Sequence, residues 1–146
     1  CGAALVAIAI CTVPATAEAQ EAAARGTFIS KDGKEVGTVS IRGGARAMVL
    51  QVELAAGALS PGLHGIHLHE AGDCSDRAKF ESAKAHAHKE GESHGFLSDA
   101  GPEAGDLPNL YVAPDGSARA DFATSLSNIA GENSILDEDG FAVIVH

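Results

Sequence analysis

Short segments in which apolar and polar residues alternate recur along most of the chain. Side chains two positions apart on a strand point to the same face, so this alternation predicts half-buried β-strands. Asp32-Gly33 marks a hairpin turn between the first two segments, and Gly43-Gly44 marks a second turn. Many short strands at near-regular spacing predict an antiparallel sandwich or barrel. The predicted strands cover residues 25–30, 35–42, 47–54, 64–70, 110–112, 118–122, 133–136 and 141–146.

One long stretch, from Ala71 to about Asn109, shows little periodicity. A loop of this length is unusual in a compact domain and is usually functional or disordered. Metal binding would order such a loop, because the binding energy then becomes folding energy. A short helix over residues 79–92 is the alternative for part of it.

Histidines are concentrated around the fourth predicted strand, which reads Ile66-His67-Leu68-His69. On a strand, His67 and His69 share one face, and Ile66 and Leu68 occupy the other. His64 has the parity of the apolar residues and is expected in the core, bonded to backbone. Two imidazoles on one face favour a borderline metal such as copper or zinc.

Several motifs in order resemble the copper-zinc superoxide dismutases. They are the glycine-flanked histidine run of 64–74, Ser82-Ala83-Lys84-Ala85-His86, His94-Gly95, the Gly-Pro-Glu-Ala-Gly-Asp-Leu-Pro-Asn run of 101–109, and the strand 141–146. The resemblance covers roughly Gly26 to His146. It implies an all-β, immunoglobulin-like antiparallel Greek-key β-sandwich or barrel with a long metal-binding loop.

The resemblance implies two metals that share one histidine. The copper ligands would be His67, His69, His86 and His146. The zinc ligands would be His86, His94, residue 103 and Asp106.

The chain departs from the family at residue 103, where Glu103 stands in place of a histidine. Glutamate binds zinc through oxygen, so the residue could still be a ligand. His88 could substitute for it, or it could be a solvated loop residue. A site without zinc that retains copper is a further alternative. Asp73 and Asp106 could orient ligating histidines, although a turn role fits Asp73 equally well.

The implied activity is the conversion of superoxide to oxygen and hydrogen peroxide by redox cycling of copper. His86 would be the catalytic residue that holds and delivers a proton. A non-catalytic copper-binding or copper-buffering domain on the same fold is the alternative. A structural sandwich that has lost its function is disfavoured, because all four copper histidines are present.

The length of 146 residues and the charge limit the alternatives further. The length fits one domain. The net charge of −10 argues against a nucleic-acid partner, which needs a basic surface. It also means that attraction of an anionic substrate must be local to the site. Family members include dimers and monomers, so a homodimer is compatible with the resemblance.

The first residues indicate export. An apolar stretch over residues 3–10 precedes two Ala-x-Ala cleavage patterns that end at Ala17 and Ala19. The stretch is too short to span a bilayer, so no membrane association is expected. We expect an N-terminally incomplete signal peptide over 1–19, a C-terminally incomplete domain over 20–146, and a periplasmic or extracellular location. Once the signal peptide is removed, Cys74 is the one cysteine left. The resemblance implies that it forms a disulfide with a cysteine that would lie beyond His146. The alternative is a natural short form with a free thiol.

Overall fold

The structure is a computed structural model that describes residues 24–44, 46–131 and 133–146. Four antiparallel strands form the larger sheet in the order β1-β2-β3-β7. Their bounds are Ala24–Ile29, Glu35–Gly43, Met48–Leu54 and Ala118–Thr124. Strand β7 returns to pair with β3 after the chain has passed through three strands of the other layer. This arrangement confirms the predicted antiparallel β-sandwich.

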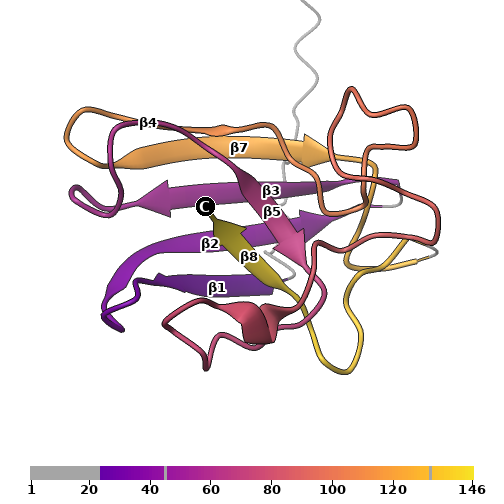
Figure 1. Cartoon of the computed structure of the whole chain (residues 1–146), viewed down its shortest axis with the longest axis horizontal. Helices are drawn as coiled ribbons and strands as arrows, with labels where there is room; N and C mark the ends of the chain where they lie inside the picture. The colour runs from indigo at the N-terminus through magenta and orange to yellow at the C-terminus, as the bar shows by residue number, and fades with distance from the viewer. Residues whose placement is uncertain (1–23, 45, 132) are drawn as a thin grey trace, which may run out of the picture.

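The second layer consists of two short antiparallel pairs that lie against the larger sheet. Strand β4 (Gly62–His64) pairs with β6 (Leu110–Val112), and β5 (Ile66–His69) pairs with β8 (Ala142–Val145). In Figure 1, β5 and β8 cross in front of the larger sheet at an angle. The predicted single strand over 64–70 is therefore two strands, which separate at Gly65 and pair with different partners.

The core lies between the two layers and follows the alternation of the sequence. On β3, Met48, Leu50 and Val52 are fully buried, whereas Val49 between them is partly exposed. Ile66 and Leu68 of β5 meet these residues from the other layer within one apolar cluster. Burying apolar side chains is worth about 25 cal/mol per Å² of area removed from water, so this contact stabilises the pairing of the layers.

The predicted strand over 133–136 does not form. Ser134 makes an isolated bridge to Asn128, and its side-chain hydroxyl bonds with the backbone of Leu136. Local bonds of this kind compete with a strand ladder, which explains the irregular backbone here.

The segment from Ala71 to Asn109 is a long loop, as predicted, and the alternative helix over 79–92 is absent. Its regular structure is one 3₁₀ turn, η1 (Glu81–Ala83). Phe80 and Lys84 flank the turn with left-handed φ angles of 57° and 65°, which a continuing helix does not allow. No helix in the described parts of the chain has the length and the apolar character needed to cross a membrane.

Candidate metal centre

Strand β5 is the base of the centre and is buried on both faces. Ile66 and Leu68 are fully buried in the core. His67 and His69, on the opposite face, have relative solvent accessibilities of 9% and 8%. The strand parity predicted from the sequence is thus confirmed. The long loop covers the histidine face, which accounts for the burial of both imidazoles.

Backbone hydrogen bonds hold the loop against the free edge of β5. The N–H of Leu68 donates to the Gly105 carbonyl at 2.9 Å, and the Leu68 carbonyl accepts from the Ala87 N–H at 2.8 Å. The Gly105 N–H in turn donates to the Ala87 carbonyl at 2.6 Å. A Cβ on Gly105 would collide with the Leu68 carbonyl oxygen, so this close approach requires glycine. These bonds place His86 and Asp106, on either side of the contact, next to the strand histidines.

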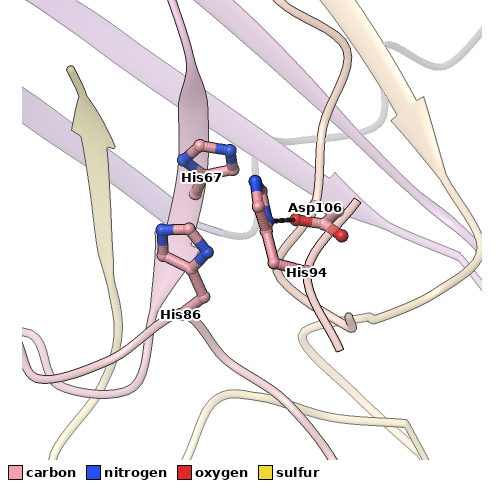
Figure 2. A group of neighbouring side chains, drawn as sticks. All are labelled: His67, His86, His94 and Asp106. Carbon is pink, nitrogen blue, oxygen red and sulfur yellow. Dashed lines mark hydrogen bonds and ion pairs between the residues drawn. The ribbon is translucent and has the colours of Figure 1, made fainter. Parts of the chain in front are cut away.

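The possible ligand atoms fall into two groups that share His86. One group contains His67, His86, His94 and Asp106, and the other contains His69, His86 and His146. Within each group, the atoms all lie within 4.8 Å of one another. Figure 2 shows that His67 comes from the strand, whereas His86 and His94 reach it from the loop. The ring centroids of His67 and His86 are 4.1 Å apart.

Two buried ring nitrogens in this cluster have no hydrogen-bond partner among the described residues. They are Nδ1 of His67 and Nε2 of His69. Buried polar atoms in proteins are nearly always partnered, so an unpartnered pair suggests a bound group. The Lys84 carbonyl accepts the Nδ1–H of His69 at 2.9 Å, which leaves its Nε2 as a free lone pair. Unprotonated imidazole nitrogens are the form that binds metals, so these residues fit a metal ion.

The surroundings of His67, His69 and His146 keep these three side chains neutral. Burial, followed by the nearby His86, His146 and His94, lowers the pKa of His67 to about 4. Burial is also the main cause that lowers the pKa values of His69 and His146. His67, His69 and His146 are therefore neutral imidazoles at neutral pH.

Asp106 organises the other side of the centre. Its Oδ1 lies 2.6 Å from Nδ1 of His94, and its Oδ2 accepts the N–H groups of Gly95 and Glu103 at 2.8 Å and 2.9 Å. Burial acts to raise the pKa of Asp106, but these hydrogen bonds outweigh it, and the pKa is lowered. Asp106 is therefore a carboxylate that accepts on both oxygens.

Glu103, the residue that departs from the family pattern, lies inside the centre. Its Oε2 is 3.2 Å from Nδ1 of His86 and 3.7 Å from Nδ1 of His94. The side chain keeps only 15% of its exposure. Glu103 thus contacts the two histidines that the sequence analysis assigned to zinc.

Three other candidates lie outside the two groups. His64 hydrogen-bonds to the carbonyls of Ser60 and His146, as expected, but it is partly exposed rather than in the core. Nδ1 of His88 approaches the backbone carbonyl of His86 at 2.9 Å, and the residue is exposed. Asp73 accepts the N–H of Ser75 at 2.8 Å, which is the turn role.

Cys74 forms no disulfide with another described residue, and the segment 1–19 expected to be a signal peptide lies outside the described residues. Sequence reasoning missed the Lys84 carbonyl and Gly105. A glycine next to the Asp106 motif was the available signal for the second, but nothing in the sequence marks a carbonyl.

The fold and the centre together define a β-sandwich protein with a histidine cluster that could hold metal ions. Its histidines converge from one strand, one loop and the end of β8. The family model for copper/zinc superoxide dismutase (SODC) matches residues 35–146, and the chain belongs to this family. The family is one of oxidoreductase enzymes.

Two bacterial relatives illustrate the similarity. The chain is 39% identical over 119 residues to a Cu-Zn superoxide dismutase of Caulobacter vibrioides, across 79% of this chain and 67% of that protein. It is 38% identical over 123 residues to the superoxide dismutase-like protein YojM of Bacillus subtilis, across 82% of this chain. The match spans 61% of YojM, so the chain corresponds to somewhat under two thirds of that relative.

A solved structure shows the same fold. The crystal structure of a double mutant of a SOD-like protein from Bacillus subtilis superposes with a TM-score of 0.76 and 33% identity. The superposition covers 84% of this chain and 80% of that one.

Proposed function

We propose that this chain is an exported superoxide dismutase that converts superoxide to oxygen and hydrogen peroxide. The observation that carries the proposal is the pair of buried, unpartnered nitrogens on His67 and His69. His69 is grouped with His86 and His146, and the ring centroid of His67 lies 4.1 Å from that of His86 and 5.0 Å from that of His146. Family membership and the similarity to the Caulobacter enzyme support the same activity.

His67, His69, His86 and His146 would hold the copper. When bound, copper supplies one-electron redox chemistry, which the disproportionation of two superoxide anions with two protons requires. The neutral state of the buried histidines suits this role, because a protonated imidazole cannot bind a metal.

Residues of the protein would orient the proposed copper ligands and transfer a proton. The Lys84 carbonyl holds His69 in the tautomer that leaves Nε2 free. Nδ1 of His86 is directed at Glu103, so its Nε2 is the atom left for the copper group. We propose that this Nε2, whenever it is not bound to copper, holds a proton and gives it to the product.

His86, His94, Glu103 and Asp106 would form the second set, and zinc is the metal that the family implies for it. The donor types fit zinc, since it binds imidazole and carboxylate. The atoms of this set also contact one another, with Asp106 close to His94 and Glu103 close to His86.

The test is a copper titration of His69→Ala against the wild-type protein, followed by a dismutase assay. Removing a ligating nitrogen should weaken copper binding on the order of 100-fold or more and abolish activity. His88→Ala is the matched control, because His88 lies outside both groups, and it should behave like the wild type. Unchanged copper affinity in His69→Ala would contradict the proposal.

The same experiment separates the alternative function. A non-catalytic copper-binding domain would lose copper in His69→Ala, yet its wild type would bind copper tightly without dismutating superoxide. The similarity to YojM, which is named superoxide dismutase-like, keeps this alternative open.

Export to the periplasm or the extracellular space is the remaining part of the proposal. It rests on the apolar stretch and the Ala-x-Ala patterns within residues 1–19. N-terminal sequencing of secreted protein should give Glu18 or Gln20 as the first residue. Mature protein that retains the apolar stretch would exclude cleavage at these patterns.

A further inference from the structure

We propose that Glu103 is a positioning residue that holds His86 for copper without a second metal. The inference rests on the proposed function, because it concerns a ligand of the proposed copper group. It adds that the carboxylate performs the orienting task that a zinc ion on Nδ1 of His86 would perform.

The contact with His86 is specific and well supported. Oε2 of Glu103 lies 3.2 Å from Nδ1 of His86, so it can accept the Nδ1–H. The backbone on either side is fixed, because the Glu103 N–H donates to Asp106 and the Ala104 N–H donates to Glu92 at 3.1 Å. With 15% exposure, the carboxylate is largely shielded from water, which strengthens its attraction for the N–H.

The partners of the donor atoms distinguish the two sets of proposed ligands. Among the proposed copper ligands, Nδ1 of His67 and Nε2 of His69 are buried and have no partner among the described residues. Among the residues of the second set, Nδ1 of His94 is paired with Asp106, and Nδ1 of His86 is paired with Glu103. Nδ1 of His86 thus already has a partner within the protein, and that partner is the Glu103 carboxylate.

The chemistry of residue 103 explains the difference. A histidine that donates Nδ1–H to a carboxylate has a fixed tautomer and ring orientation, and its Nε2 becomes a better ligand. A histidine at position 103 would offer a neutral ring, which attracts the Nδ1–H of His86 less strongly than a carboxylate does. Glu103 provides the negative charge that strengthens this hydrogen bond.

The experiment measures copper affinity by chelator competition on the metal-free full chain, with and without excess zinc, and records the Cu(II) EPR spectrum. For the wild type we expect copper affinity to change less than about twofold when zinc is added. Glu103→Ala should weaken copper binding about 10-fold and alter the EPR spectrum, since outer partners of metal ligands contribute 10–100-fold. Glu103→Gln keeps an acceptor oxygen of the same shape but loses the charge, so its EPR spectrum and copper affinity should lie between those of Glu103→Ala and the wild type.

Two further variants complete the design. Glu103→His should bind one equivalent of zinc, and its copper affinity should become zinc-dependent by about 10-fold or more. Glu90→Ala removes an exposed glutamate of the same loop and should match the wild type throughout.

Either of two results would overturn the proposal. One is zinc uptake by the copper-loaded wild type that tightens copper binding 10-fold or more. The other is a folded Glu103→Ala protein with the copper affinity and EPR spectrum of Glu90→Ala. Both results are measured as copper binding by variants at position 103 or by the wild type with zinc. Failure of the proposed function would instead appear as a wild type that does not dismutate superoxide, or as unchanged copper affinity in His69→Ala.

Discussion

Lys84, in the long loop, contacts the proposed copper ligand His69 through its backbone carbonyl. Its backbone has a conformation that glycine favours. Its φ and ψ angles are 65° and −153°, a region that costs a non-glycine residue on the order of 1–3 kcal/mol. Its carbonyl nevertheless accepts the Nδ1–H of His69, and its Nζ lies 3.1 Å from Asp139. The residue thus combines a costly backbone with a contact that fixes a proposed ligand.

Replacement of Lys84 by glycine should raise the free energy of unfolding by about 1 kcal/mol, because glycine adopts this conformation without strain. Copper affinity should not change, since the carbonyl remains. Lys84→Ala is the matched control: it removes the exposed ion pair with Asp139 equally but keeps the strain. Denaturant unfolding of both variants gives the comparison, and equal stability of the two would show that the backbone carries no strain.

At the level of elements, β5 is the strand on which the centre depends. Strand β8 pairs with one of its edges and brings His146, and the loop residues Ala87 and Gly105 bond to the other edge. His67 and His69 therefore lie close to His146 on one side and to the loop residues on the other only while the loop stays bonded to this edge.

Gly105→Ala tests that attachment. The added Cβ would collide with the carbonyl oxygen of Leu68 and would lie 3.0 Å from the backbone nitrogen of Ala87. Both are backbone atoms, so neither can move away by a change of rotamer. We expect a loss of about 2 kcal/mol in the free energy of unfolding, in the range of overpacking mutations, together with weaker copper binding.

Gly44→Ala is the control for the loss of a glycine. A Cβ there would lie 3.4 Å from the Ala47 carbonyl, an ordinary contact, so its stability should stay within about 0.5 kcal/mol of the wild type. If the two alanine variants unfold at the same denaturant concentration, the close approach at Gly105 is not needed.

For the whole molecule, the cluster of neutral buried histidines links stability to pH. His67 has a pKa of about 4 in the folded protein and about 6.5 in the unfolded chain. The folded state therefore binds fewer protons than the unfolded state between these values. Its stability is complete above pH 6.5 and is lost as the pH falls towards 4. His69 and His146, whose pKa values are also lowered, add to the same trend.

The metal-free protein should accordingly lose roughly 3 kcal/mol of stability between pH 6.5 and pH 4 through His67. Urea unfolding at several pH values within this range measures the slope. His67→Gln should flatten the slope, because it removes the group that titrates. A wild-type stability that is constant or rises on acidification would contradict the burial of a neutral His67.

The sequence by itself determined the strands, the shared face of His67 and His69, and the long loop with its histidines. These features follow from local rules, since alternation with a period of two decides which side chains are buried together. The ordered family motifs then indicated which residues are the proposed ligands. Local rules failed at residues 133–136, where side-chain hydrogen bonds to the backbone replaced the strand ladder.

Only the tertiary structure decided how distant residues combine. It separated β4 from β5 at Gly65, placed His67 beside His94 as well as near His146, and brought Glu103 against His86. No local pattern encodes these contacts, because they depend on the docking of the loop on the edge of β5. That docking uses backbone groups of Leu68, Ala87 and Gly105, which the amino-acid sequence does not distinguish from any others.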